Sequence, residues 1–468
     1  MSKVLFIYPN KESYPIIPAA IGMLSGVLKY QGHTVDLFDI TFMVEDRFTD
    51  HKAREKLRIV EKTDIDKYWG KPEKVNIKEK LLDKISLFKP DLIAFTVVEN
   101  NYVCARDLFA AIKAKFDIPI IAGGMFPTVA EDFFINDKNV DMICVGEGEA
   151  AIVELAGRMD RNRDYSDVAN LIVKQKGRVI RNKPAPYYNW QPPVFQDWSI
   201  FDQRHFYKPF MGRVWKTGYF ELSRGCPYNC SYCNNYWYQQ AFKDLGPYRR
   251  ERSIEGAIEE MVYKKDRYSL ELAWFHDENF CMMSDERFDE FCAKYKDRVG
   301  LPFFIMTRAD TLLDESRLRK IKDAGCATIS MGIETGDGHI RASKLNKNVK
   351  NSVYLRAFDN CRKYGIRTTA NVMVGLPGEK EEDILKTIDF CKECRADSIG
   401  IAIFVPYYGT KLRKECIEKG LIEDRYYDDI SFSYTSILKM TGISKKRFEE
   451  IYYNFNDLVY GAKSEKYG

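Results

Sequence analysis

Three cysteines on one short segment carry the strongest chemical signal in this chain. Cys226, Cys230 and Cys233 follow the spacing C-x-x-x-C-x-x-C, in a segment that opens with Arg-Gly and has a proline after the first cysteine. Three thiolates held this close on one loop can ligate three irons of a four-iron cluster and leave the fourth iron open. An open iron can bind substrate-like groups, which a fully ligated electron-transfer cluster cannot do.

The other cysteines do not indicate a disulfide framework, because the chain has the character of an intracellular protein. Cys391 and Cys394 have the spacing C-x-x-C, but they lie within Glu381–Arg395, whose apolar residues follow one helix face. We therefore interpret this pair as helix packing. The remaining seven are scattered singly and are interpreted as core or surface thiols: Cys104, Cys144, Cys281, Cys292, Cys326, Cys361 and Cys416.

Composition limits the classes of function. A chain of 468 residues with 45% hydrophobic residues predicts two or three domains with sizeable cores. Lys and Arg total 72 against 68 Asp and Glu, so the net charge of +4 gives no electrostatic case for nucleic acid or an anionic membrane. The first strand-like run begins at Val4, which leaves no room for a cleavable signal peptide, and no apolar run has transmembrane length. We expect a cytoplasmic protein without a membrane span.

Residues 1–155 alternate short apolar runs with helical patterns. Two helices are predicted, over 18–31 and 101–116. Runs that are apolar on both faces and joined by helices predict an α/β fold with a doubly wound, Rossmann-like parallel sheet. Ligands of such sheets bind beyond the carboxyl ends of the strands. The predicted strands are Val4–Tyr8, Thr34–Asp39, Asp91–Val97, Pro119–Ala122 and Asp141–Val145.

The rest of the chain divides into three segments. Residues 156–211 contain a predicted hairpin, Leu171–Asn182, that turns at Lys176-Gly177, followed by a linker rich in proline and aromatic residues. Residues 212–415 show six β/α units, and residues 416–468 form a helical C-terminal region. In barrels, catalytic residues lie at the carboxyl ends of the strands. The six predicted strands are Tyr219–Ser223, Leu270–Phe275, Phe303–Thr307, Thr328–Ile333, Thr368–Val374 and Ser398–Phe404.

The cysteine segment, with the aromatic Tyr232 before its last cysteine, and the six β/α units resemble the radical S-adenosylmethionine superfamily. The resemblance implies a partial (β/α)6 barrel and a [4Fe-4S] cluster on Cys226, Cys230 and Cys233, which are the catalytic and metal-ligating residues. It also implies contacts to S-adenosylmethionine from residues at the strand ends: Tyr232, Asp277, Glu278, Arg308, Glu334, Gly375 and Val405.

These residues have different expected roles. Acidic groups at 277 and 278 could take the amino group of the methionine part. Arg308 could pair with a carboxylate through two hydrogen bonds, and a structural ion pair is an equally plausible role for it. Glu334 matches the family's ribose-binding carboxylate. Gly375 and Val405 begin two turns that resemble the adenine side of the site, although Asn371 replaces a glycine often found upstream.

The first domain resembles the cobalamin-binding domain found ahead of many radical enzymes. The resemblance rests on a Pro-Ala-Ala-Ile-Gly helix start, Gly32-His33-x-Val35, Ala122-Gly123-Gly124 and Gly146-Glu147-Gly148-Glu149. Relatives in which a histidine replaces the lower ligand of the cobalt carry D-x-H-x-x-G after the first strand, but no histidine occurs in Pro9–Pro18. We therefore expect a cobalt without a protein imidazole ligand. His33 lies next to a strand start, and we expect it on the surface. The implied cobalamin contacts are Pro18, Val97, Glu99, Gly123, Gly124, Glu147 and Gly148.

The resemblance implies reductive cleavage of S-adenosylmethionine to a 5′-deoxyadenosyl radical. The leading hypothesis is methylation of an unactivated carbon or phosphorus centre of a small-molecule or lipid substrate, with electrons from a ferredoxin or flavodoxin. The alternative within enzymes is cyclisation, ring contraction or oxidation without methyl transfer. A tRNA methylthiotransferase would need three cysteines in the first domain, where only Cys104 and Cys144 lie. A non-catalytic cobalamin or iron–sulfur sensor is the remaining alternative.

Overall fold

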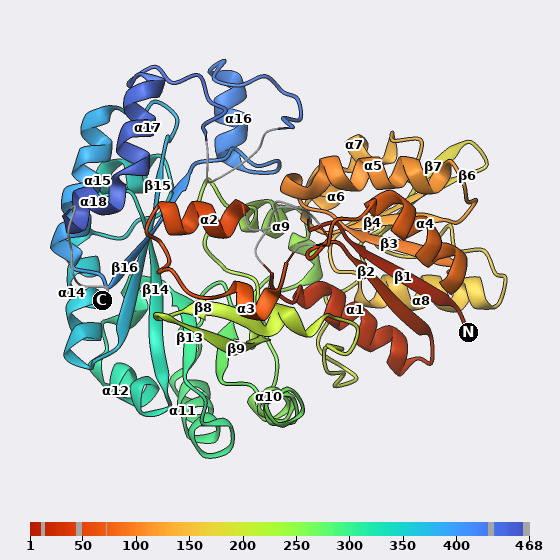
Figure 1. The fold of residues 1–468 in the computed structure, drawn as a ribbon, viewed down its shortest axis with the longest axis horizontal. Helices are drawn as coiled ribbons and strands as arrows, with labels where there is room; N and C mark the ends of the chain where they lie inside the picture. Colours follow the sequence, from red (N-terminus) through yellow and green to blue (C-terminus); the bar gives the residue numbers. More distant parts are fainter. Residues whose placement is uncertain (11–14, 44–48, 72, 429–434, 462–468) are drawn as a thin grey trace. The chain divides into compact units, whose positions relative to one another are not determined.

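The computed structural model describes residues 1–10, 15–43, 49–71, 73–428 and 435–461 (Figure 1). The chain forms two compact units whose segments interleave along the sequence. The first unit consists of Met1–Asp50, Asp66–His205 and Gln240–Pro247, and the second of His51–Ile65, Phe206–Gln239 and Tyr248–Gly468.

The first unit is built on a seven-stranded sheet with strand order β2-β1-β3-β4-β5-β6-β7. The first five strands are parallel, and the last two extend the sheet antiparallel. Between β1 and β3 the strand order reverses direction, and such a switch point is where doubly wound sheets bind ligands. The strands are β1 (Lys3–Tyr8), β2 (Thr34–Asp39), β3 (Leu92–Thr96), β4 (Ile120–Gly123), β5 (Met142–Cys144), β6 (Leu171–Gln175) and β7 (Arg178–Arg181).

Helices cover both faces of this sheet. Helix α1 (Ala19–Tyr30) packs against α8 (Glu149–Asp160), and α4 (Ile77–Phe88) packs against α5 (Tyr102–Lys113). The strands between them are buried on both sides, as the continuous apolar runs require. The predicted α/β class and doubly wound sheet are thus confirmed. Shorter helices are α3 (Asp66–Trp69), α6 (Met125–Val129) and α7 (Glu131–Ile135).

The predicted hairpin is present, and it belongs to the sheet of the first unit. Its strands β6 and β7 are joined at Lys176-Gly177, and both residues have the positive φ that a tight hairpin turn requires. Strand β6 pairs with β5, so the sheet continues beyond residue 155. Sequence alone could not show this, because an antiparallel edge strand and a free hairpin have the same pattern.

The second unit holds a separate seven-stranded sheet with order β16-β15-β14-β13-β12-β9-β8. The six strands from β9 to β16 run parallel, and β8 pairs antiparallel with β9. This arrangement confirms the predicted half-barrel. The strands are β8 (Tyr207–Phe210), β9 (Arg213–Phe220), β12 (Leu272–Phe275), β13 (Phe303–Thr307), β14 (Cys326–Glu334), β15 (Arg367–Val374) and β16 (Ser398–Ile403).

The first barrel strand ends earlier than predicted. Strand β9 stops at Phe220, and Ser223-Arg224 instead form β10, which pairs with β11 (Arg250–Glu251) in a small separate ladder. The reason is a side chain that follows the neighbouring strand β12: the Asp277 carboxylate accepts hydrogen bonds from the Leu222 N–H and the Ser223 hydroxyl. The backbone therefore leaves the barrel at this point and enters the cysteine loop.

Helices lie against the outer face of the barrel sheet, while its inner face stays partly open. Outward-facing Ile329, Val372 and Ile401 are buried, whereas inward-facing Asn371 and Gly400 are partly exposed. A closed (β/α)8 barrel fills its interior with side chains. The half-barrel leaves space on this face for a ligand. The main helices are α10 (Ile254–Tyr268), α11 (Asp285–Lys294), α12 (Glu315–Asp323), α14 (Asn351–Lys363) and α15 (Glu381–Cys394).

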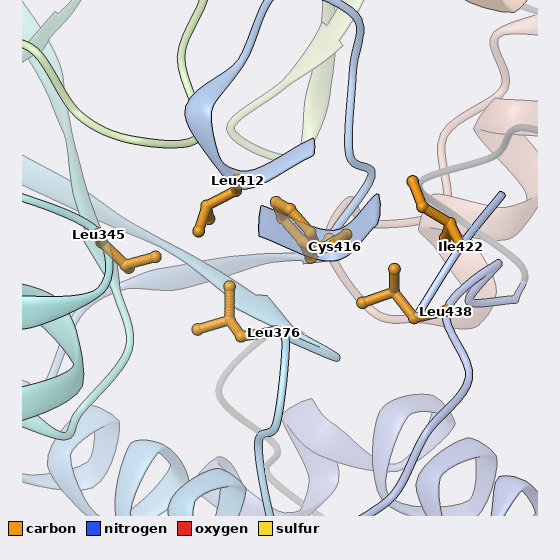
Figure 2. Packing of buried hydrophobic residues seen from close by; sticks show 7 residues of the cluster. Leu345, Leu376, Leu412, Cys416, Ile422 and Leu438 are labelled. Carbon is orange, nitrogen blue, oxygen red and sulfur yellow. The ribbon is translucent and has the colours of Figure 1, made fainter. Parts of the chain in front are cut away.

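The predicted helical tail is confirmed by α17 (Lys445–Tyr453) and α18 (Phe455–Tyr460). Together with α16 (Lys411–Glu418) this region supplies part of an apolar cluster, and Tyr232 of the cysteine loop packs against that cluster. Figure 2 shows its side chains converging from separate loops and α16. Among the described residues, no helix has both the length and the apolar character to cross a membrane. The cluster consists of Leu345, Leu376, Phe404, Leu412, Cys416, Ile422 and Leu438.

Candidate functional site

The cysteine loop is held by hydrogen bonds to its own backbone carbonyls. The Gln239 side chain donates to the carbonyls of Cys226 (2.8 Å) and Tyr228 (3.1 Å), and Asn346 donates to that of Asn229 (2.8 Å). Gly225 enters the loop with φ +86°, and a Cβ there would collide with the Tyr248 carbonyl. A loop tied in this way can hold three sulfurs at fixed positions.

None of the twelve cysteines forms a disulfide, and burial raises the pKa of Cys226 and raises that of Cys233 to about 12. Iron bound by these thiols would have to displace their protons, and its charge would supply the driving force. Over the residues the structure describes, no three His, Cys, Asp or Glu side chains converge on a single ion. A cluster needs no such convergence, because each of its cysteines binds a different iron.

The two acidic residues after β12 have different surroundings. Asp277 is 1% exposed and both its oxygens are used within the chain, with Leu222 N–H at 3.0 Å and the Ser223 hydroxyl. Burial raises its pKa to about 7. Glu278 is exposed, yet the surrounding protein desolvates it enough to raise the pKa of its carboxyl, as expected in a concave site. Glu278 is thus placed to meet a ligand, and Asp277 to hold the loop.

Arg308 follows β13 and lies beside the cysteine loop. Its guanidinium stacks on the Tyr228 ring at 3.7 Å from the ring centre. The guanidinium donates two hydrogen bonds to the Asp310 carboxylate, from Nε at 3.1 Å and from Nη2 at 3.0 Å. The structural ion pair therefore exists, and Arg308 can meet a ligand carboxylate only by sharing or leaving Asp310.

Glu334 ends β14 where the register with β15 shifts, and its φ is +68°. It is buried, and one carboxylate oxygen accepts hydrogen bonds from Lys347 Nζ (2.7 Å) and the Tyr232 hydroxyl (2.9 Å). Two predicted residues, Tyr232 and Glu334, are thereby brought into contact. Lys347 was missed, because nothing in its sequence context connects it to a residue on the preceding strand.

The turns after β15 and β16 are buried. Gly375, with φ +79°, and Leu376 donate their N–H groups to the Glu379 carboxylate at 2.6 and 3.1 Å. Burial raises the pKa of Glu379 to about 8. Val405 is buried, and its carbonyl accepts a hydrogen bond from Tyr407 N–H at 2.9 Å. Both turns present rigid backbone at the carboxyl end of the half-barrel.

A further pair of side chains lies on the inner face of the half-barrel and was not predicted as functional. The His276 imidazole, on the residue before Asp277, stacks on the Tyr219 ring with centroids 5.4 Å apart and planes 11° apart. Burial lowers the pKa of His276 to about 4, so the imidazole is neutral at physiological pH. The ring is thus a neutral hydrogen-bonding group in the open interior.

In the first unit, the predicted cobalamin contacts gather at the carboxyl edge of the sheet. Gly124 has φ +106°, and a Cβ there would lie 2.8 Å from the Val97 carbonyl. Val97 is buried and donates its N–H to Gly123 at 2.8 Å, which joins the ends of β3 and β4. Val98 and Met125 beside them are exposed, at 43% and 36%. The edge is therefore a glycine-lined apolar surface that a bulky, flat cofactor could cover.

The other members of this set surround the same edge. Pro18 precedes α1, Glu99 is buried in the turn after β3, and Gly148 precedes α8. The Glu147 carboxylate accepts a hydrogen bond from Tyr188 N–H at 2.7 Å. Thr128, which was not predicted, accepts from Gly146 N–H at 3.1 Å and donates to the Gly124 carbonyl at 2.8 Å. This hydroxyl fixes the spacing of the two glycine turns.

The positions of two histidines in the first unit bear on the expectation of a cobalt without an imidazole ligand. His33 accepts a hydrogen bond from Ser2 N–H at the start of β1, which is the amino edge of the sheet and the wrong end for a cobalt ligand. His205 pairs with Asp39 at the end of β2 and is fully buried among aromatic rings. Residues 11–14 of the segment without histidine lie outside the described residues. The expectation stays a prediction.

Comparison with known protein families gives two matches in the expected order. The B12 binding domain matches residues 11–156, and the Radical SAM superfamily matches residues 220–391. The fold and the site thus define a chain in which a cobalamin-binding domain precedes a radical S-adenosylmethionine domain. In this order of domains the chain is similar to cobalamin-dependent radical S-adenosylmethionine enzymes.

Individual relatives span most of the chain. The anaerobic magnesium-protoporphyrin IX monomethyl ester cyclase of Rubrivivax gelatinosus is 26% identical over 441 residues, covering 89% of this chain and 70% of the relative. The cytidylyl-2-hydroxyethylphosphonate methyltransferase of Streptomyces wedmorensis is 22% identical over 381 residues, covering 72% and 68%. The structure of the radical S-adenosylmethionine methyltransferase TsrM from Kitasatospora setae aligns with TM-score 0.66 and 19% identity, over 90% of this chain and 78% of that one.

The cofactors of the chain are accordingly a [4Fe-4S] cluster, S-adenosylmethionine and cobalamin. The residues present fit all three. The tied loop carries three free thiols, the half-barrel carries a buried carboxylate with one oxygen unused by the protein, and the first sheet has an apolar glycine edge. The assignment of individual residues to each cofactor remains a proposal.

Proposed function

We propose that this enzyme is a methyltransferase that acts on an unactivated carbon or phosphorus centre. The observation that carries the proposal is the presence, in one chain, of a B12 binding domain and a radical S-adenosylmethionine domain. Similarity to relatives named as methyltransferases supports it. When bound, the cluster supplies the electron that cleaves S-adenosylmethionine, and cobalamin supplies the methyl group.

The residues of the second unit bind and orient S-adenosylmethionine in this proposal. Cys226, Cys230 and Cys233 hold the cluster and leave one iron open for the amine and carboxylate of the methionine part. Glu278 is exposed and can accept hydrogen bonds from the N–H groups of that amine. Glu334 accepts from ribose hydroxyls, while the buried turns at Gly375 and Val405 exclude water from the adenine side.

The residues of the first unit hold cobalamin by shape in this proposal. Gly123 and Gly124 let the backbone come close to the cofactor, because neither carries a side chain that would stand in the way. Exposed Val98 and Met125 are covered when the ligand binds, which removes apolar surface from water. Glu99, Glu147, Gly148 and Pro18 complete the rim.

A second candidate is radical cyclisation without methyl transfer. It is favoured by one observation, namely that a relative matching 89% of this chain is named as a cyclase. The same residues would serve both reactions, because cleavage of S-adenosylmethionine precedes either outcome. The half-open inner face with its neutral His276 would contact the substrate in both cases.

The two candidates differ in the fate of the methyl group. The test uses anoxically reconstituted protein with cobalamin, reductant and S-adenosylmethionine carrying a deuterated methyl group, incubated with a small-molecule extract. Methyl transfer predicts S-adenosylhomocysteine together with 5′-deoxyadenosine, and a product that carries the deuterated methyl. Formation of 5′-deoxyadenosine with no S-adenosylhomocysteine would refute methyl transfer and support the cyclase alternative.

The expected surroundings of the enzyme follow from the same proposal. The reductant is a small electron-transfer protein such as a ferredoxin or flavodoxin, the substrate is a small molecule or lipid, and the reaction takes place in the cytoplasm. The net charge of +4 supports the exclusion of nucleic acid as a partner.

A further inference from the structure

The Glu334 carboxylate is held asymmetrically. Its oxygen Oε1 accepts two hydrogen bonds, from Lys347 Nζ at 2.7 Å and from the Tyr232 hydroxyl at 2.9 Å. Over the described part of the chain, no donor reaches Oε2. The residue is 8% exposed, so the group is buried and yet retains some access to solvent.

Lys347 ties the carboxylate to the backbone that carries it. The ammonium group is 6% exposed and also donates to the Gly332 carbonyl at 2.7 Å, two residues before Glu334. Burial alone would lower the pKa of Lys347, but the charge of Glu334 outweighs it and the pKa is raised. One cation therefore balances the buried carboxylate and closes the irregular turn at the end of β14.

Tyr232 ties the same oxygen to the cysteine loop. Its hydroxyl donates the hydrogen bond to Oε1, and Tyr232 is followed directly in the sequence by Cys233. The Tyr232 ring packs against the apolar cluster of Figure 2, so the ring keeps its place without the hydroxyl. Loss of the hydroxyl should therefore leave Oε1 with Lys347 as its remaining donor among the described residues, and leave the loop in position.

We propose that Lys347 and Tyr232 are positioning residues that anchor Oε1 of Glu334 and so present Oε2 to the ribose hydroxyls of the bound nucleoside. The inference rests on the proposed role of Glu334 and adds the two residues that set its orientation. A carboxylate that is free to rotate can present either oxygen to the ribose. It must then lose rotational entropy when the ligand binds, which weakens binding. The anchored carboxylate has already lost this freedom before the ligand arrives.

The matched control is Tyr354. Its hydroxyl donates to the Gly332 carbonyl at 2.8 Å, next to Lys347, and does not reach the carboxylate. Tyr232→Phe and Tyr354→Phe thus remove the same group from the same neighbourhood, and only the first removes a donor to Oε1. Lys347→Met removes the charge and keeps the length of the side chain.

The experiment measures binding rather than turnover. Anoxically reconstituted protein is titrated calorimetrically with S-adenosylhomocysteine and with its 2′-deoxyribose analogue. The unsubstituted protein should prefer the ribose form by about tenfold, the usual effect of a hydrogen bond to a charged group. Tyr232→Phe and Lys347→Met should reduce the preference to about twofold, and Tyr354→Phe should retain it. If Lys347→Met does not fold, the two tyrosine variants carry the test.

Two outcomes contradict the inference in different ways. If the unsubstituted protein prefers the ribose form and Tyr232→Phe keeps that preference in full, the anchoring role is wrong while the ribose site stands. If the unsubstituted protein binds both nucleosides equally, Glu334 is not the ribose acceptor, and both the inference and this part of the proposed site are wrong.

Discussion

The two units present their ligand edges by different means. At the carboxyl edge of the first sheet, the conspicuous features are glycines with positive φ, backbone hydrogen bonds and exposed apolar side chains at Val98 and Met125. At the carboxyl edge of the half-barrel, buried or desolvated charges predominate, as at Asp277, Glu334 and Lys347. Both edges belong to parallel sheets, so topology alone does not explain the difference.

The difference indicates what each edge has to do. A large preformed cofactor can be held mainly by shape and by covering apolar surface, which favours small residues and close backbone approach. A nucleoside that must be cleaved at one bond has to be oriented, which favours anchored polar groups in a water-poor site. Substitutions at the first edge should therefore affect cobalamin alone, and substitutions at the second should affect S-adenosylmethionine chemistry alone.

The largest expected effect separates the two edges. Cys230→Ala should remove one cluster ligand and abolish formation of 5′-deoxyadenosine, while cobalamin binding is unchanged because the loop belongs to the second unit. Iron analysis, the absorption spectrum and the cobalamin content of anoxically purified protein provide the measurement. Cys104→Ala, in the first unit, is the control and should keep both iron and cleavage. Retained cleavage in Cys230→Ala would rule out the assigned ligands.

The reciprocal change is Gly124→Ala. The added Cβ would lie 2.8 Å from the Val97 carbonyl at a φ of +106°, so the turn must move, and in the proposed site this turn contacts cobalamin. We expect the affinity for cobalamin to fall at least tenfold, which corresponds to a loss of about 1.4 kcal/mol of binding free energy. Cleavage of S-adenosylmethionine should be retained. Spectroscopic titration with hydroxocobalamin measures the affinity. Equal affinity in both proteins would show that this turn lies away from the cofactor.

Asp277 makes the stability of the second unit depend on pH. Its pKa is raised from 3.8 to about 7, so between these values the folded state binds more protons than the unfolded state. The free energy of unfolding should fall as the pH rises from about 4 to about 7, by on the order of 4 kcal/mol at most. Asp277→Asn should remove this slope. Urea unfolding at about pH 4 and about pH 8, on either side of most of that range, measures the difference, and parallel pH profiles for the two proteins would contradict the assignment.

The smallest expected effect is at Gly157, in the last turn of α8. A Cβ there meets nothing within 4 Å, unlike one at Gly124. Gly157→Ala should raise the free energy of unfolding by about 0.5–1 kcal/mol, because alanine has the higher helix propensity. Cobalamin affinity should not change. A loss of affinity similar to that in Gly124→Ala would mean that any glycine substitution perturbs this unit, and the comparison would fail.

Strands and helices were predictable where their bounds depend on the local sequence pattern alone. Strand β13 (Phe303–Thr307) was predicted with its observed bounds, and β2 (Thr34–Asp39) likewise, because each is an apolar run between turn residues. The early end of β9 was not predictable, since it depends on Asp277, which follows the neighbouring strand β12. The domain boundaries at 155, 211 and 415 stay a prediction.

The site was predictable as a set of positions and less so as a set of contacts. Adjacent carboxylates at 277 and 278 read alike in sequence, and only the fold shows that one is buried and the other exposed. Arg308 could be placed at a strand end, but its pairing with Asp310 depends on the local turn. Lys347 and Thr128 were missed because each acts through a contact that no sequence period or motif records.

The most direct test of the account is the cofactor content of protein purified without oxygen from cells grown with cobalamin. The account predicts about four irons per chain, as one four-iron cluster requires, together with a bound corrinoid, and loss of iron alone in Cys230→Ala. Zinc in place of iron, or a corrinoid-free protein that still cleaves S-adenosylmethionine and methylates its substrate, would contradict it.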